Sequence, residues 1–159
     1  MKVLVVGGAG YIGSHITKAL VRVGHQTTVF DNLSTGRREN VFPGAEFICG
    51  DILSPDEINA AAKGMDAIVH LAAKKAVGES MSDPGKYAVN NISGTINLLN
   101  AAVANGVDKF IFSSSATVYG DPRYLPIDEK HPITSINFYG YTKVQLTILL
   151  LARRKKSSR

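Results

Sequence analysis

Residues 1–15 read MKVLVVGGAGYIGSH, and this stretch decides the fold of the chain. The apolar run Lys2–Val6 ends at the pattern Gly7-x-x-Gly10-x-x-Gly13, and an amphipathic segment follows directly. A strand, a glycine turn and a helix in this order can hold a dinucleotide pyrophosphate. The glycines allow a tight turn and close backbone approach, and the helix N-terminus offers free N–H groups. The context predicts a dinucleotide-binding turn rather than a glycine-rich turn without a ligand.

An acidic residue follows the turn at the distance expected for ribose binding. Asp31 ends the next apolar run and lies 18 residues after Gly13, close to the spacing of about 20 that is typical of such sites. A carboxylate here would accept ribose hydroxyls and repel a 2′-phosphate, so Asp31 favours NAD. The neighbouring Arg37 and Arg38 leave NADP as the alternative.

The bulk properties describe one domain with a hydrophobic core. The chain has 159 residues, of which 45% are hydrophobic, and this length is enough for such a core. Its single cysteine, Cys49, excludes an intrachain disulfide and is typical of a reducing compartment. The N-terminus lacks a signal-peptide pattern, and the apolar run 146–152 is too short to span a membrane. We expect a soluble, cytoplasmic protein with no membrane partner.

The net charge of +5 comes from the C-terminus. Five basic residues lie within 153–159, and residues 1–152 contain equal numbers of acidic and basic side chains. A basic segment of this kind can bind nucleic acid or anionic lipid, but it is more often a solvated end. We therefore expect a disordered basic tail over 153–159, no nucleic-acid partner and no metal site.

Strand and helix patterns alternate along the chain. Strands are predicted at 2–6, 26–31, 45–49, 66–71 and 109–112. Helices are predicted at 11–23, from Ser54 as N-cap to about 63, at 84–105 and at 138–152. This alternation indicates an α/β fold, a Rossmann-like doubly wound parallel sheet with helices on both faces. Residues 122–136 are predicted to be an irregular connection, a kind of segment that often carries function.

Candidate chemistry lies after the last predicted strand. Ser113, Ser114 and Ser115 stand at its carboxyl end, where open α/β sheets bind ligands. Tyr139 and Lys143 are four residues apart, so on a helix they share one face. A tyrosine phenol, with an ordinary pKa near 10, is a poor base at neutral pH, but a neighbouring ammonium favours the phenolate. Beside a dinucleotide, these groups would take a proton from an alcohol as hydride leaves its carbon; alone, the Tyr-x-x-x-Lys pattern also fits an exposed helix face.

Together these residues resemble the extended short-chain dehydrogenase/reductase superfamily and, within it, the UDP-glucose 4-epimerase family. The resemblance runs from Met1 to about Lys143. It is carried by motifs at 7–15, 31–36, 50–52, 70–73, 75–80, 90–91, 94–95 and 113–120. Ala116-Thr117 follows Ser115, where related nucleotide-sugar dehydratases usually carry an acidic residue, so the pattern favours the epimerases.

The resemblance implies NAD as cofactor and a UDP-sugar, UDP-glucose or UDP-galactose, as substrate. The implied catalytic set is Ser115, Tyr139 and Lys143; Ser115 and Tyr139 would also bind substrate, and Tyr139 and Lys143 would also contact the cofactor. Besides the three glycines, the implied cofactor residues are Tyr11 and Ile12 at the pyrophosphate, Asp31, Asn32, Leu33, Ser34, Thr35 and Gly36 at the adenosine ribose, Asp51 and Ile52 at the adenine, and Leu71, Ala72, Ala73, Lys74, Lys75 and Asn90 along the channel.

Three features depart from the family pattern. Lys74 replaces a residue that is usually apolar, and Phe138 stands where a proline commonly precedes the tyrosine. The third is length, because the family continues well beyond the position of Lys143. We therefore expect residues 1–152 to be a partial NAD-binding domain without its substrate domain, whether the short C-terminus is natural or an early stop or frameshift. The hypotheses are an epimerase of galactose metabolism impaired by truncation, a non-catalytic NAD-binding fragment, or a related dehydratase or reductase; a homodimer fits each.

Overall fold

The structure is a computed structural model that describes the backbone of residues 1–157 and the side chains of residues 1–152. The chain divides into two compact units. Unit 1 comprises Met1–Ala73 and Gly94–Ser113, and unit 2 comprises Lys74–Ser93 and Ser114–Arg159.

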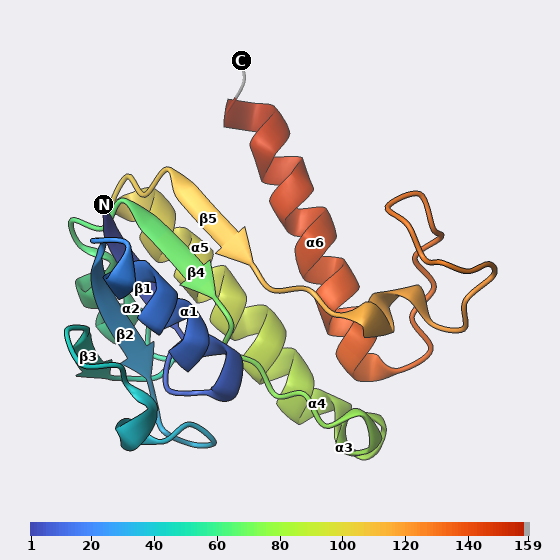
Figure 1. The fold of residues 1–159 in the computed structure, drawn as a ribbon. Coiled ribbons are helices and arrows are strands. Elements are labelled where there is room, and N and C mark those ends of the chain that lie inside the picture. Colours follow the sequence, from blue (N-terminus) through green and yellow to red (C-terminus); the bar gives the residue numbers. More distant parts are fainter. Residues whose placement is uncertain (158–159) are drawn as a thin grey trace. The chain divides into compact units, whose positions relative to one another are not determined.

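Unit 1 is built on a parallel sheet of five strands (Figure 1). The strands are β1 (Lys2–Val6), β2 (Gln26–Asp31), β3 (Glu46–Cys49), β4 (Ala67–His70) and β5 (Lys109–Phe112). Their spatial order is β3-β2-β1-β4-β5, so the strand that precedes the glycine turn lies at the centre. Val6 at its end is in register with Phe30 on one side and with His70 on the other. The predicted doubly wound parallel sheet is confirmed.

Helices cover both faces of this sheet, as parallel strands require. Successive side chains of β1 point to opposite faces. Leu4 and Val6 are buried in one core with side chains of α2 (Pro55–Ala62) and α5 (Gly94–Ala104). Val3 and Val5 are buried in the other core, against which Ile16 and Leu20 of α1 (Tyr11–Arg22) pack. The continuous apolar run in β1 therefore reflects burial on both faces.

The predicted element boundaries in the first 73 residues agree with the structure to within one residue. Two details differ. Ser54 occupies the N-cap position of α2, but its side chain makes no capping hydrogen bond, and Pro55 begins the helix. A short 3₁₀ helix, η1 (Arg38–Asn40), interrupts the predicted loop after β2.

Unit 2 contains helical elements that the sequence patterns did not separate. The helix predicted over 84–105 is α4 (Pro84–Tyr87), a π-helical turn η2 (Ala88–Ser93) and then α5, which belongs to unit 1. The short helices α3 (Val77–Ser82) and η3 (Ala116–Tyr119) were not predicted. They are too short for a periodic apolar pattern to emerge.

The last helix, α6 (Phe138–Ser157), runs past its predicted end at residue 152. The backbone of most of the predicted basic tail is therefore helical rather than disordered, because the Leu-rich helix leads into Arg and Lys, which also favour helix. Residues 158–159 and the side chains of the tail lie outside the described residues. Within the described part of the chain, no helix is long and apolar enough to cross a membrane.

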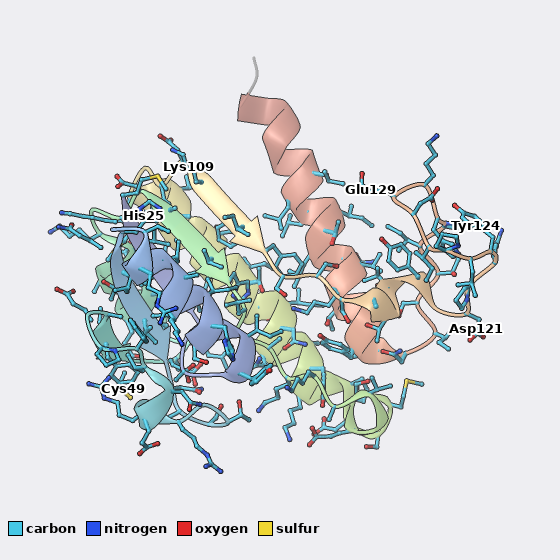
Figure 2. All side chains as sticks on the ribbon, in the orientation of Figure 1. His25, Cys49, Lys109, Asp121, Tyr124 and Glu129 are labelled. Carbon is cyan, nitrogen blue, oxygen red and sulfur yellow. The ribbon has the colours of Figure 1, made fainter. Side chains whose placement is uncertain are left out.

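The connection between η3 and α6 is irregular, as predicted, and its own contacts order it. Figure 2 labels Asp121, Tyr124 and Glu129 on this loop. The Tyr124 hydroxyl donates to Asp128 Oδ1 at 2.8 Å, which raises the pKa of the Tyr124 phenol and lowers that of the Asp128 carboxyl. The buried ring of His131 accepts the Arg123 N–H through Nε2 at 3.0 Å.

Candidate functional site

The glycine turn of unit 1 needs glycine at two positions for reasons internal to the protein. Gly7 has φ +84°, and a Cβ there would lie 2.6 Å from the backbone nitrogen of Ala72. A Cβ at Gly13 would lie 2.7 Å from the Cα of Gly8. Real Cβ atoms do not approach backbone this closely, so either side chain would push the turn away from the sheet or from α1.

Gly10 is different, because the protein itself leaves room there. A Cβ at Gly10 would meet only the Gly7 carbonyl oxygen, at an ordinary contact distance of 3.4 Å. Gly10 is the N-cap of α1, and the next two residues, Tyr11 and Ile12, have 78% and 58% of their surface exposed. The open space lies at a helix N-terminus, where anions bind favourably. Of the three glycines, Gly10 is the one at which a Cβ would make no close contact within the protein.

Asp31 joins the glycine turn to the loop after β2. Its carboxylate is buried, and Oδ2 accepts the Ala9 N–H at 3.0 Å. Oδ1 accepts the N–H of Leu33 at 2.8 Å and so supports the left-handed backbone of that residue, which has φ 57°. Each carboxylate oxygen can accept a second hydrogen bond, so Asp31 keeps acceptor capacity for ribose hydroxyls.

The predicted ribose and adenine residues come together at the carboxyl ends of β2 and β3. Asn32 Nδ2 donates to Asp51 Oδ2 at 2.8 Å, and Oδ1 of Asp51 accepts the Leu53 N–H at the same distance. The Asp51 N–H itself donates to Glu57 Oε2 at 2.8 Å. Glu57 was not singled out from the sequence, because its acidic side chain also suits the first turn of α2.

The other predicted cofactor residues of unit 1 frame the same turn. Leu71 and Ala72 donate their N–H groups to the Val6 carbonyl oxygen at 2.8 and 3.0 Å, which places them beside Gly7. Gly36 packs on Ala9, 2.9 Å from a notional Cβ. Ser34 and Thr35 are exposed between Asn32 and Gly36, and Ala73 is half-buried and ends the first segment of unit 1.

Arg37 and Arg38, which kept NADP as the alternative cofactor in the sequence analysis, follow Gly36 in the loop after β2. The Arg38 guanidinium stacks over the Phe47 ring, 4.0 Å from its centroid. Arg37 is exposed, and its backbone N–H donates to the Ala9 carbonyl oxygen at 3.1 Å. The stacking gives Arg38 a partner within the protein.

Unit 2 holds the remaining predicted cofactor residues. Asn91, which was not predicted, holds both sides of the Lys74 backbone: Oδ1 accepts the Lys74 N–H at 2.9 Å, and Nδ2 donates to the Lys74 carbonyl oxygen at 3.0 Å. Asn90 Nδ2 also donates to Asn91 Oδ1. The Lys75 side chain is exposed. Asn91 lies in the π-helical turn, a feature frequently found at functional sites.

The predicted catalytic residues all lie in unit 2. Tyr139 and Lys143 share one face of α6, with Lys143 Nζ 5.9 Å from the centre of the Tyr139 ring, as their spacing predicted. Burial lowers the pKa of the Lys143 ammonium to about 8, and only 3% of this residue is exposed. Ser115 caps η3, and its Oγ accepts from the Thr117 hydroxyl at 2.9 Å.

A glycine brings η3 close to the start of α6. A Cβ on Gly140 would lie 2.8 Å from the Thr117 carbonyl oxygen, so only glycine allows this approach. The segments that carry Ser115 and Tyr139 are therefore neighbours within unit 2. Across the described residues, no group of three or more His, Cys, Asp or Glu side chains could hold a metal ion.

The parallel sheet, the glycine turn and the acidic residue after β2 define a protein of the Rossmann-type dinucleotide-binding class. Residues 3–158 match the NAD dependent epimerase/dehydratase family, and the chain belongs to that family. The resemblance drawn from the sequence motifs is confirmed.

The relatives are UDP-glucose 4-epimerases. The chain is 46% identical over 148 residues to the enzyme of Lactobacillus helveticus, covering 92% of this chain and 45% of the relative. It is 49% identical over 144 residues to the enzyme of Rhizobium meliloti, covering 89% and 43%. The solved structure of UDP-glucose 4-epimerase from Brucella ovis in complex with NAD is 43% identical with a TM-score of 0.91, covering 95% of this chain and 47% of that one. The chain thus spans less than half the length of these relatives.

Proposed function

We propose that this chain binds NAD through unit 1. The observation that carries the proposal is the open N-terminus of α1 at Gly10 beside the Asp31 carboxylate, which holds the same turn through Ala9. The helix N-terminus suits the pyrophosphate and the carboxylate suits the ribose. The adenine would lie at Asp51 and Ile52. Membership of an NAD dependent family and a solved relative in complex with NAD support this assignment.

We further propose that the chemistry is epimerisation of UDP-galactose and UDP-glucose at carbon 4. Tyr139 takes the proton of the sugar 4-hydroxyl and later returns it, and Ser115 hydrogen-bonds the same oxygen. The protonated form of Lys143 favours the phenolate of Tyr139. When bound, NAD supplies the ring that accepts a hydride from carbon 4 and gives it back. Return of that hydride to the opposite face of the sugar would invert carbon 4, and Tyr139 would give back the proton that it took.

Turnover by this chain is expected to be slow. Holding reactants in the right geometry supplies about 7–11 kcal/mol of barrier reduction. More than half the length of the relatives has no counterpart in these 159 residues. We propose that the grip on UDP and sugar depends on that remaining length, so that NAD binding survives here better than catalysis.

Calorimetry with NADH, followed by a UDP-galactose turnover assay with and without added NAD, tests both parts. We expect NADH to bind, and any turnover to disappear in Tyr139→Phe. NADH binding without turnover in any preparation would support the alternative of a non-catalytic NAD-binding fragment. Release of a dehydrated or reduced sugar would indicate a dehydratase or reductase. Folded protein that binds no NADH would overturn the proposed function.

A further inference from the structure

The first turn of α6 is tied down by side chains on both sides. A helix leaves its first N–H groups without partners inside the helix. Here the Gly140 N–H donates to Asn137 Oδ1 at 2.8 Å, as an ordinary N-cap. The Tyr139 N–H donates to Ser80 Oγ at 3.1 Å, and the Phe138 N–H points to Met81 Sδ at 3.3 Å. Two of the three partners therefore come from α3, far away in the sequence.

Ser80 is built to accept this hydrogen bond. Its side chain is fully buried, and its own proton is donated to the Val77 carbonyl oxygen at 2.6 Å. With the proton committed to that carbonyl, the hydroxyl oxygen presents only lone pairs to the Tyr139 N–H. The orientation of the Ser80 hydroxyl is thus set within α3 itself.

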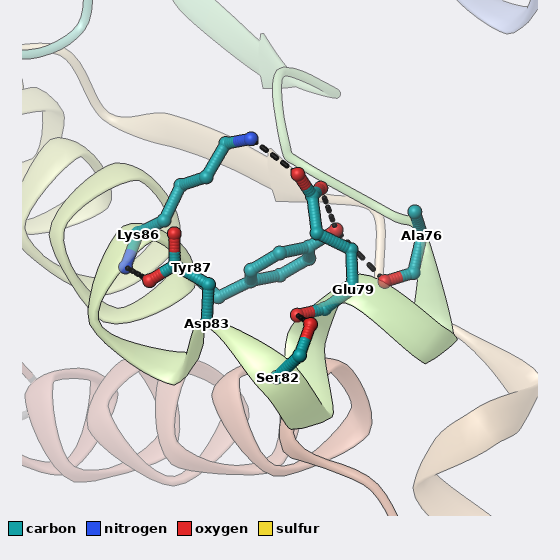
Figure 3. A network of polar contacts seen from close by, with 6 residues as sticks. All are labelled: Ala76, Glu79, Ser82, Asp83, Lys86 and Tyr87. Atoms are coloured by element: carbon teal, nitrogen blue, oxygen red, sulfur yellow. Dashed lines mark hydrogen bonds and ion pairs between the residues drawn. The ribbon is translucent and has the colours of Figure 1, made fainter.

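A polar network in turn holds α3, which with six residues is too short to be stable alone (Figure 3). The buried Tyr87 hydroxyl lies 2.8 Å from both Glu79 Oε2 and the Ala76 carbonyl oxygen. Lys86 forms an ion pair with Glu79. Hydrogen bonds from Lys86 and Tyr87 lower the pKa of the Glu79 carboxyl, and burial together with Glu79 raises the pKa of the Tyr87 phenol. The network joins the N-terminal half of α3, at Ala76 and Glu79, to α4.

We propose that Ser80 is a positioning residue for Tyr139 and that the Glu79–Tyr87 network holds Ser80 in place. The proposal rests on the proposed function, in which Tyr139 handles the substrate proton. Displacement of a reacting group by about 1 Å can cost on the order of a hundredfold in rate, so a fixed backbone at Tyr139 matters for the chemistry. Phe138 adds to this arrangement, because the proline common in the family at this position has no N–H to offer Met81.

Amide hydrogen exchange, read residue by residue by NMR on the full chain, tests the proposal. In Ser80→Ala we expect exchange at the Tyr139 amide to accelerate at least about fivefold, the factor expected for one net hydrogen bond. The Gly140 amide, held by Asn137, should keep its protection. Ser82→Ala is the matched control, because Ser82 lies on the same helix and its hydroxyl donates to the Glu79 carbonyl oxygen at 3.1 Å. Ser80→Cys, with a weaker acceptor, should fall between Ala and wild type.

A second readout concerns the Tyr139 ring, observed with ¹³C-labelled tyrosine and assigned through Tyr139→Phe. Its signal should shift in Ser80→Ala and not in Ser82→Ala, and measurable turnover should show a lower kcat with unchanged KM. The proposal would be overturned if amide exchange in Ser80→Ala accelerated equally at Tyr139 and Gly140. It would also be overturned if the NMR signal of the Tyr139 ring did not shift. If Ser80→Ala does not fold, Tyr87→Phe replaces it, with the same expectations. NADH binding is measured separately for wild type and for each variant. Loss of NADH binding in wild type would count against the proposed function, whereas the exchange and ring signals test the role of Ser80.

Discussion

The backbone N–H of Ala9 donates to the Asp31 carboxylate at 3.0 Å, so the residue expected to bind ribose also holds the turn expected to bind pyrophosphate. The two ends of the candidate site are therefore coupled through one buried side chain. Changes at Asp31 should alter cofactor choice and turn geometry together.

Asp31→Asn should weaken NADH binding about tenfold to a hundredfold, the range for a hydrogen bond to a charged group. Wild type should prefer NADH to NADPH, because its carboxylate repels a 2′-phosphate, and the substitution should narrow that preference. Calorimetry with both cofactors measures this. Asn40→Ala is the control: it removes the other side-chain bond to Ala9, at 3.0 Å to its carbonyl oxygen, without changing charge. Equal affinities for NADH and NADPH in wild type would contradict the prediction.

The glycines of the turn should separate into two kinds. Gly13→Ala should cost about 1–3 kcal/mol of folding free energy, the usual cost of overpacking, because its Cβ meets backbone. Gly10→Val should cost only about 1 kcal/mol as a poorer N-cap, yet should abolish NADH binding. Urea unfolding and NADH titration of both variants check this. Full NADH affinity in Gly10→Val would show that the pyrophosphate does not approach this residue.

Lys143 should make stability depend on alkaline pH. Its folded-state pKa of about 8 lies below the ordinary 10.5, so between these values the unfolded chain binds the proton more tightly. Stability from this group therefore rises with pH across that window, and below it the buried ammonium costs about 3 kcal/mol. Lys143→Met should be more stable than wild type at pH 7, with the difference shrinking towards pH 10. Urea unfolding across this range measures it, and Lys63→Met, at an exposed position, should show a constant difference.

Asn91 should be needed for stability although it lies outside the expected catalytic set. Its carboxamide holds both polar groups of the Lys74 backbone and donates to Thr142 Oγ1 at 3.2 Å. Asn91→Leu removes the partners of these partly buried Lys74 backbone groups and should cost about 1–3 kcal/mol of folding free energy. Thr142→Val removes one of the partners and should cost less. If urea unfolding gives Asn91→Leu the same free energy of unfolding as wild type, water replaces the hydrogen bonds of the carboxamide.

Local patterns predicted the strands of unit 1 and its helices α1 and α2, because the pattern of a strand or helix depends on residues that are close together in the sequence. A buried strand shows as an apolar run, and the glycine turn shows as glycines at fixed intervals. The prediction of one helix over 84–105 missed its division into three elements. The π-helical turn at Ala88–Ser93 is too short to show a periodicity of its own. The six-residue α3 was missed for the same reason.

The sequence by itself determined the parallel sheet, the glycine turn at Gly7, and the shared face of Tyr139 and Lys143. Each follows from chain geometry over a few residues. Only the tertiary structure decided that Ser80 accepts the Tyr139 N–H, 59 positions along the chain, and that Asp31 accepts the Ala9 N–H. A single polar residue carries no periodic signal, and its partner is known only when folding brings two distant segments together and burial obliges their polar groups to pair.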